Sequence, residues 1–316
     1  MTSTFAPKTD LAPTLQRVLR AIRRRREYGF HFPGNFYAIS FDRVGEAGSQ
    51  VSLQADCRAG DGTIEGTALG VFADLALAAP VRAALPEDTR MATVNMQLQL
   101  TGAPCRGPVT AESSFHGYIQ GAAGRQAVSR VTLRGNGQEI GLGTGTFMVF
   151  EQPPGMPIPF LSPADPRIDD LPLLDPDTDL RPEERALYDY AQGTLGDDGA
   201  CGDGADRFWG YRTRPREGGA SGTMANGPHI ANRVGNVQGG VLLGFAHATA
   251  RAAMSEAWAL NGITANYVSP GAGRELTAEA EIVHHGRTTA VTRVVVATDT
   301  GRRVLEVLAS HSLRAT

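Results

Sequence analysis

The chain has 316 residues, of which 41% are hydrophobic and 20% are charged, and its formal net charge is −3 at pH 7. This composition excludes a disordered chain, and the slightly acidic balance argues against a nucleic-acid-binding protein, which carries a basic surface. The three cysteines, Cys57, Cys105 and Cys201, form no CxxC pair, so we expect no metal site and no disulfide framework. The longest apolar stretch, 68–85, is interrupted by charges and a proline, and no signal-peptide pattern is present. We therefore expect no membrane span and a cytoplasmic location.

The chain is divided by a segment rich in proline and aspartate, which runs from Gln152 to Pro182. Proline fixes φ and removes a backbone donor, so this composition disfavours both a regular helix and a central strand. We expect a first module in residues 1–150, a linker in 151–182 and a second module in 183–316.

The two halves repeat one order of elements. In each half we expect a leading helix (11–28 and 182–192), an alternating strand, a glycine-bearing turn and a long apolar helix (62–79 and 235–253), offset by about 173 residues. Further alternating strands follow each long helix, beginning at Thr93, Gln126 and Gly143 in the first half and at Thr264, Ala290 and Leu305 in the second. This pattern predicts an α+β fold in which an antiparallel sheet wraps around one long helix, present twice.

The turn before each long helix resembles the signature of the hotdog-fold acyl-CoA thioesterases, in particular their PaaI-like branch. That signature is an Asn, five residues, a His-Gly-Gly that opens the central helix and an acid nine positions after the His. In the second half Asn232, Gln238, Gly239 and Gly240 follow this pattern, with Gln in place of His, while His247 replaces the acid. In the first half Ala59 and Glu65 replace Asn and His, but the acid is present as Asp74 and the Ser/Thr strand position as Thr93.

The resemblance implies a tandem double hotdog with its sites between the modules. One composite site would join Asp74 and Thr93 of the first half to Asn232, Gln238 and Gly239 of the second. The opposite site, with Ala59, Glu65 and His247, departs from the pattern. The resemblance also implies that Gly240, Arg125 and Arg287 contact CoA, the last two from glycine-arginine turns. It further implies an acyl-CoA substrate, no cofactor other than this substrate, and a homodimer of double-hotdog chains.

Thioester hydrolysis needs an activated water or an attacking carboxylate, together with a donor for the oxygen that becomes negative. A carboxylate within an apolar helix, such as Asp74, is costly unless it faces a polar cavity, and partial burial would raise its pKa toward the range of a general base. Free N–H groups at a helix N-terminus near Gly239 are suited to bind the oxyanion. Asp74 is therefore expected to act as general base or nucleophile.

Other interpretations stay open at this point. A hydratase or dehydratase on the same fold would use Glu65 and His247 as acid and base. A non-catalytic acyl-CoA-binding protein would explain why the usual His is replaced. The basic run Arg23–Arg26 fits either a solvated helix face or a docking site for CoA phosphates. The HFPG sequence at His31–Gly34 is expected to form a turn, and Pro80 is expected to kink or end the first long helix.

Overall fold

The computed structural model describes residues 11–55, 57–86, 89–121, 124–151, 170–195 and 208–314. Most of the linker, Cys201 and the N-terminal segment before Leu11 lie outside the described residues. The strands of the first module are β1 (Ile39–Arg43), β2 (Ser49–Leu53), β3 (Thr89–Leu100), β4 (Val109–Gly121), β5 (Gly124–Gly135) and β6 (Gln138–Glu151). Those of the second are β7 (Arg212–Arg216), β8 (Gly219–Ala225), β9 (Trp258–Tyr267), β10 (Glu275–His285), β11 (Thr289–Thr298) and β12 (Arg303–Leu313).

All of these strands join one antiparallel sheet of twelve strands, in the order β1-β2-β4-β5-β6-β3-β9-β12-β11-β10-β8-β7. The second half of this order repeats the first half in reverse, as two modules related by a twofold axis require. The modules meet where β3 pairs with β9, with Asn95 opposite Asn266 and Gln99 opposite Gly262. The predicted α+β double hotdog is therefore observed.

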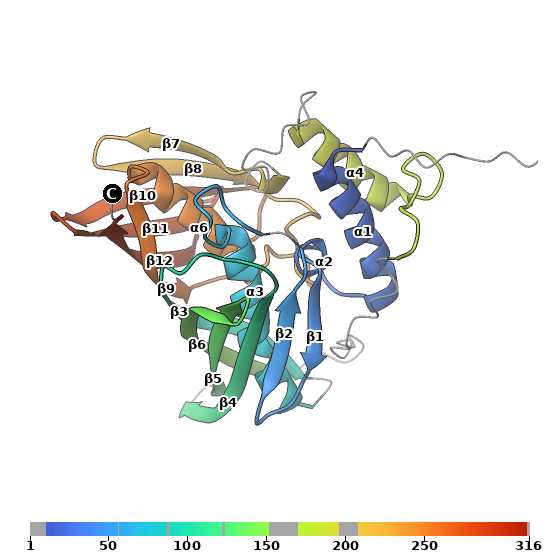
Figure 1. Ribbon diagram of the computed structural model, residues 1–316, viewed down its shortest axis with the longest axis horizontal. Coiled ribbons are helices and arrows are strands. Elements are labelled where there is room, and N and C mark those ends of the chain that lie inside the picture. Colours follow the sequence, from blue (N-terminus) through green and yellow to red (C-terminus); the bar gives the residue numbers. More distant parts are fainter. Residues whose placement is uncertain are drawn as a thin grey trace, which may run out of the picture.

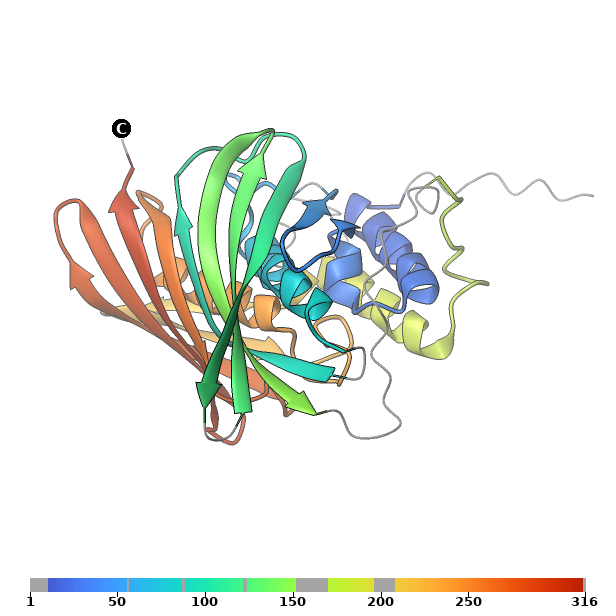
Figure 2. The same cartoon turned by 90° about the horizontal axis from the view of Figure 1, so that it is seen from below.

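Two long helices, α3 (Gly66–Ala83) and α6 (Gly239–Ala253), lie side by side on the concave side of the sheet (Figures 1 and 2). Their backbones contact where Gly70 meets Gly240, because a Cβ on Gly240 would lie 2.2 Å from the nitrogen of Val71. α3 is long and apolar enough to cross a membrane by composition alone, but 78% of that window is buried inside the fold. It is the core helix of its module.

Of the two outcomes expected at Pro80, a kink or an end of the helix, the end is wrong, because α3 continues through this residue to Ala83. A proline inside a helix disturbs the carbonyls of the preceding turn. Here the hydroxyl of Ser129, on β5, donates to the carbonyl of Leu77 at 2.8 Å. This bond ties the turn before Pro80 to the sheet, whereas the carbonyl that loses its helical donor to the proline is that of Ala76.

Three helices outside the sheet cover one end of the molecule: α1 (Pro13–Tyr28), α2 (Phe32–Phe36) and α4 (Pro182–Leu195). α1 begins with a proline in its first turn and ends at Gly29, which has a φ of 62°. α1 and α4 pack against each other although some 150 residues separate them (Figure 1). We call these three helices the helical cap. The HFPG sequence is not a simple turn, since His31 caps the short helix α2 and accepts a hydrogen bond from the nitrogen of Gly34.

Candidate active site between the two modules

Asp74 lies in the middle of α3, facing the N-terminus of α6, and its side chain is buried with 8% of the residue exposed. The hydroxyl of Thr93 donates to its Oδ1 at 2.8 Å, and Nε2 of Gln238 donates to its Oδ2 at 2.7 Å. The register of β3 against β6 shifts between Thr93 and Asn95, and such a bulge re-aims nearby side chains. The two modules therefore meet at this carboxylate.

The N-terminus of α6 is shaped by three residues. Gln238 is its N-cap, and its Oε1 accepts from the nitrogen of Val241 at 3.0 Å. Gly239 leaves room for the carboxylate, since a Cβ there would lie 3.2 Å from Oδ2 of Asp74. The hydroxyl of Tyr267 donates to the carbonyl of Gly239 at 3.0 Å. The N–H of Gly239 has no acceptor within the described residues, as expected at the first position of a helix.

These groups line a cavity of about 1010 Å³ between the modules and the helical cap. Asp74, Thr93, Gln238, Gly239 and Tyr267 form part of its wall, and we call these five residues the Asp74 site. Most of the remaining wall is apolar and comes from α3, β3, β6 and the cap: Phe30, Phe32, Leu75, Ala78, Met91, Phe147, Met148 and Phe150. The volume and the apolar lining are typical of a small-molecule site.

Burial raises the pKa of Asp74 to about 6, although the hydrogen bonds from Thr93 and Gln238 favour the charged form and limit the rise. The carboxyl therefore changes its protonation state close to neutral pH, where a general base is most effective. Burial and the Asp74 charge raise the pKa of Tyr267 well above its usual value, so this hydroxyl stays protonated. No cluster of three or more metal-ligating side chains occurs in the described part of the chain.

Residues 228–312 match the family model described as the acyl-CoA thioesterase N-terminal domain. The second module is therefore similar to an acyl-CoA thioesterase domain. A comparison with curated proteins finds no match. Among solved structures, a hotdog-fold protein of unknown function from Alicyclobacillus acidocaldarius is 12% identical with a TM-score of 0.54, and covers 90% of this chain and 99% of its own.

The tesB protein of Mycobacterium avium subsp. paratuberculosis is 17% identical with a TM-score of 0.50, and covers 87% of this chain and 96% of its own. At such identities these likenesses show the fold. Because they span nearly the whole of both chains, the prediction of a double hotdog is confirmed. The prediction of a thioesterase is confirmed by the family model, and acyl-CoA thioester hydrolysis is the activity that this family implies. The match does not name the PaaI-like branch, which stays a prediction.

The structure places Asn232 in the loop between β8 and α6. It lies in the cavity wall, and its Oδ1 accepts from the nitrogens of Val234 and Asn236 at 3.0 and 3.1 Å. Its oxygen is therefore used to hold the 232–236 loop. The predicted role of Asn232 in orienting water or the thioester would have to come from its amide nitrogen.

The three residues predicted to contact CoA lie away from the cavity wall. Gly240 is buried against α3, where it allows the two helices to approach. Arg125 lies with its guanidinium 4.2 Å from the ring centroid of Tyr118, and Arg287 is exposed in the turn between β10 and β11. Among the residues that line the described cavity, none of the three occurs. The geometry gives no support to these three assignments.

The pseudo-equivalent position on the other side consists of Ala59, Glu65, Gly66 and His247, which we call the His247 site. Glu65 caps α3, accepting from the nitrogens of Thr67 at 2.7 Å and Ala68 at 2.9 Å and from the hydroxyl of Tyr37 at 2.5 Å. His247 is half-buried against Gly66, and no hydrogen bond joins Glu65 to His247 among the described contacts. The pairing of these two residues as acid and base is therefore not observed.

Sequence reasoning missed several residues of the cavity wall. Tyr267 ends an expected strand, but nothing in its spacing shows that its hydroxyl reaches the start of α6. His31 and Phe30 reach the cavity because the helical cap folds over the cleft. Arg82, in the last turn of α3, lies eight residues after Asp74 and about 80° around the helix from it, so its helical spacing did not mark it as part of the cavity wall.

Proposed function

We propose that this protein hydrolyses acyl-CoA thioesters at the Asp74 site, with Asp74 as the residue that activates water. The observation that carries the proposal is the buried carboxylate of one module, hydrogen-bonded to Gln238 of the other, beside the start of α6 in a cavity of about 1010 Å³. The match of residues 228–312 to a thioesterase domain supports the reaction class.

In the proposed reaction, a water bound to the Asp74 carboxylate attacks the thioester carbonyl carbon and gives its proton to Asp74. The carbonyl oxygen becomes negative and accepts a hydrogen bond from the N–H of Gly239, where the positive end of the α6 dipole adds to the stabilisation. The C–S bond then breaks, and the CoA thiolate takes the proton from Asp74. Water and thioester are consumed, acid and thiol are released, and no cofactor takes part.

Direct attack by Asp74 is the other course, and it would form an acyl-enzyme anhydride. The geometry favours the general base, because Thr93 and Gln238 each donate to one carboxylate oxygen and thereby reduce its nucleophilicity. A carboxylate has lone pairs left for a water after these two bonds. Rapid acid quench followed by mass spectrometry of the peptide containing Asp74 would distinguish the courses, because only direct attack leaves an acyl adduct.

The two other interpretations fit less well. A hydratase would need Glu65 free to exchange a proton, but its carboxylate is held by two helix N–H groups and by Tyr37. A non-catalytic acyl-CoA-binding protein would have the cavity without turnover. It would be favoured if acyl-CoA binds and no thiol is released.

The test is release of free thiol from a panel of acyl-CoAs by the wild-type protein, Asp74→Ala and the matched control His247→Gln, which changes the equivalent position in the other module. We expect Asp74→Ala to lower kcat by about 1,000-fold, which is within the range for loss of a general base. We expect His247→Gln to retain at least half of the wild-type activity. The wild-type kcat/KM should rise with pH through about 6, because the deprotonated Asp74 is the active form. Wild-type rates in Asp74→Ala would remove this residue from the mechanism.

The cytoplasmic location and the homodimer remain predictions of the sequence. Size-exclusion chromatography with light scattering would test the dimer.

A further inference from the structure

Tyr267 lies in the cavity wall at the C-terminal end of β9, and the proposed hydrolysis gives it no role. The sheet fixes its position, because it pairs with Leu305 of β12 and the nitrogen of the next residue, Val268, donates to the carbonyl of Val304 at 2.8 Å. Its hydroxyl donates to the carbonyl of Gly239 at 3.0 Å. A well-held strand end therefore contacts the first residue of α6.

Gly239 carries the N–H group that the start of α6 offers to a ligand in the cavity. The N–H of Val241 is bonded to the side chain of Gln238. Gly240 is buried against α3 and lies outside the cavity wall that the described residues form. Gly239 lines the cavity, and its N–H has no acceptor within the described residues. Of these groups, the N–H of Gly239 is the one available to bind the oxyanion.

A glycine at this position has to be restrained by its neighbours, because without a Cβ it can adopt many φ and ψ values. The peptide group before Gly239 is anchored, since the carbonyl of Gln238 accepts from the nitrogens of Val241 and Leu242, both at 3.1 Å. The peptide group after Gly239 carries the carbonyl to which Tyr267 donates. Tyr267 therefore restrains the glycine from the side that its N-cap does not hold.

The ring of Tyr267 adds to this restraint. A Cβ on Gly239 would lie 3.4 Å from Cε1 of Tyr267 and 3.2 Å from Oδ2 of Asp74, so the ring and the carboxylate both border the space that a side chain would occupy. Among the described contacts, no hydrogen bond joins the Tyr267 hydroxyl to Asp74. The influence of Tyr267 on catalysis would therefore pass through Gly239 and not through the base.

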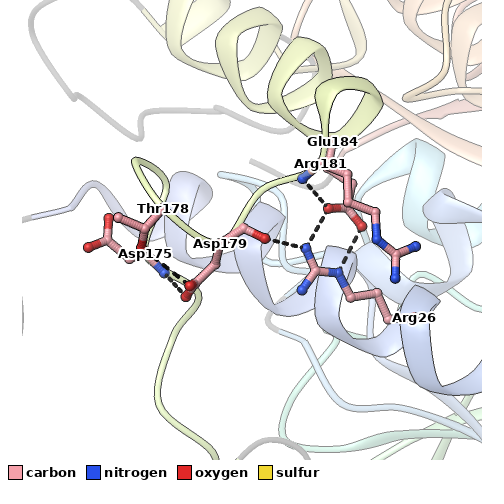
Figure 3. Close-up of polar contacts among 6 residues, drawn as sticks. All are labelled: Arg26, Asp175, Thr178, Asp179, Arg181 and Glu184. Atoms are coloured by element: carbon pink, nitrogen blue, oxygen red, sulfur yellow. Dashed lines mark hydrogen bonds and ion pairs between the residues drawn. The ribbon is translucent and has the colours of Figure 1, made fainter.

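The helical cap covers the cavity in which this donor lies, with Phe30 and His31 in the wall. The cap is held together by Arg26 of α1, whose guanidinium binds both carboxylate oxygens of Glu184 on α4, at 2.9 and 2.5 Å, and the carbonyl of Asp179 at 2.6 Å (Figure 3). A hydrogen bond to a developing charge is stronger where water is partly excluded. Accurate placement of the donor therefore matters in this cavity.

We infer that Tyr267 is a positioning residue, which holds Gly239 so that its N–H donates to the oxygen that becomes negative during hydrolysis. That oxygen belongs to the thioester, so the inference rests on the proposed function. The same helical turn offers a matched control. The hydroxyl of Tyr211, which precedes β7, donates to the carbonyl of Val241 at 3.0 Å, but Tyr211 is not among the residues that line the described cavity.

The first test compares thiol release from an acyl-CoA by wild type, Tyr267→Phe and Tyr211→Phe. We expect Tyr267→Phe to lower kcat about tenfold with KM within about twofold, because one hydrogen bond is lost and the donor is less well placed. The pH dependence of kcat/KM should keep its midpoint at about 6, since Asp74 keeps its hydrogen bonds. Tyr211→Phe should keep kcat within about twofold. A wild-type kcat in Tyr267→Phe, a shifted midpoint, or an equal loss in Tyr211→Phe would overturn the inference.

Binding of two CoA thioethers separates this inference from the proposed function, because binding needs no turnover. Trifluoroacetonyl-CoA has a ketone whose hydrate is tetrahedral, like the reacting carbon, whereas S-propyl-CoA has no carbonyl. By calorimetry, Tyr267→Phe should bind the ketone about tenfold more weakly than wild type does, and S-propyl-CoA within about twofold. If the wild type releases no thiol but shows this difference, the proposed function fails and the placement of the donor stands. A change of the same size for both compounds, or none for either, would overturn the inference, and so would a wild type that binds neither.

Discussion

The Asp74 site and the His247 site are built on similar backbone turns, 173 residues apart, yet only the Asp74 site has the groups that the proposed hydrolysis uses. The nitrogen of Gln238 bonds to the carbonyl of Ile230, and that of Glu65 to the carbonyl of Cys57, at 2.8 and 2.7 Å. The turns before the two helices contain Gly235 and Gly62, with φ of 80° and 81°. The backbone is thus nearly the same on both sides.

The side chains of Gln238 and Glu65 differ in whether their hydrogen bonds reach the other module. Gln238 caps α6 through its oxygen and uses its nitrogen to reach Asp74 in the other module. Glu65 has only acceptors, and it uses them on its own helix and on Tyr37, which also accepts from Nε1 of Trp209 at 3.0 Å. One backbone can therefore support a composite site on one side and a packed core on the other, and the choice is made by a few side chains.

Replacement of Asp74 by Asn should give the largest effect and separate function from stability. Asn keeps the size and the bonds, accepting from Gln238 and donating to the Thr93 hydroxyl, but it cannot take a proton from water. We expect activity to fall by about 1,000-fold. The raised pKa of Asp74 also means that its charge destabilises the fold, so Asp74→Asn should be more stable at pH 8 by roughly 2–4 kcal/mol.

Urea unfolding of the wild type and of Asp74→Asn at pH 8 measures the difference in stability, and thiol-release assays measure the difference in activity. The folded protein holds the Asp74 proton more tightly than the unfolded chain, so the stability gain in Asn should disappear below about pH 4. An Asn variant less stable than wild type at pH 8 would contradict the assignment of Asp74 as a strained, functional carboxylate.

The first glycine of each helix offers a second comparison. A Cβ on Gly239 would lie 3.2 Å from Oδ2 of Asp74, whereas a Cβ on Gly66 would lie 2.0 Å from Nδ1 of His247. We expect Gly239→Ala to lower kcat by about tenfold through displacement of the carboxylate, with stability within about 1 kcal/mol. Gly66→Ala should destabilise the fold by about 1–3 kcal/mol through overpacking, with little effect on kcat. Urea unfolding and thiol-release assays of both variants test this. If Gly66→Ala lowered kcat and Gly239→Ala did not, the functional site would be the His247 site.

Local patterns were enough to predict most of the fold. The β11 strand alternates buried and half-buried residues along its length, which is the period that its sequence shows. The repeat itself predicted two modules, and the sheet order confirms them. The continuation of α3 through Pro80 could not be predicted, because a proline inside a helix usually breaks it and the strands that pack against α3, β4 and β5, come later in the chain.

The site was predictable where it follows the repeat and not where it depends on the cap. The spacing of Asp74 and Gln238 placed both residues in equivalent motifs, and the structure brings them to 2.7 Å. Arg25 and His31 reach the cavity only because α1 and α2 fold over the cleft, with α1 held by Arg26 and Glu184. No local pattern reports a contact between residues 158 positions apart.

The N-cap residues of α6 and α3, Gln238 and Glu65, should differ in the same way, with Gln238 affecting activity and Glu65 affecting stability, but with smaller effects. Gln238→Ala removes the cap of α6 and the donor to Asp74, so we expect kcat to fall by about tenfold and stability by about 1 kcal/mol. Glu65→Ala removes two capping bonds and leaves the buried hydroxyl of Tyr37 without its carboxylate, so stability should fall by about 2–3 kcal/mol with kcat nearly unchanged. Thermal unfolding and thiol release measure both. A loss of kcat in Glu65→Ala larger than in Gln238→Ala would show that the His247 site contributes to catalysis.

The last comparison is a difference in the sign of the pH dependence of stability between Asp74 and His247, which leaves activity at neutral pH unchanged in the His247 variant. Burial, with the positive charges of Arg251 and His311, lowers the pKa of His247 to about 3, so it stays neutral in the folded protein. Below pH 6.5 the unfolded chain binds a proton at this residue and the folded protein does not, so acid removes stability by about 1.4 kcal/mol per pH unit until the folded pKa is approached. Asp74 behaves oppositely, since acid between about pH 6 and pH 4 relieves its buried charge. Urea unfolding between pH 8 and pH 4 measures the free energy of unfolding at each pH. Compared with wild type, this free energy should fall less with acid in His247→Gln and more in Asp74→Asn. Parallel curves for the three proteins would mean that neither group is desolvated in solution as it is in the structure.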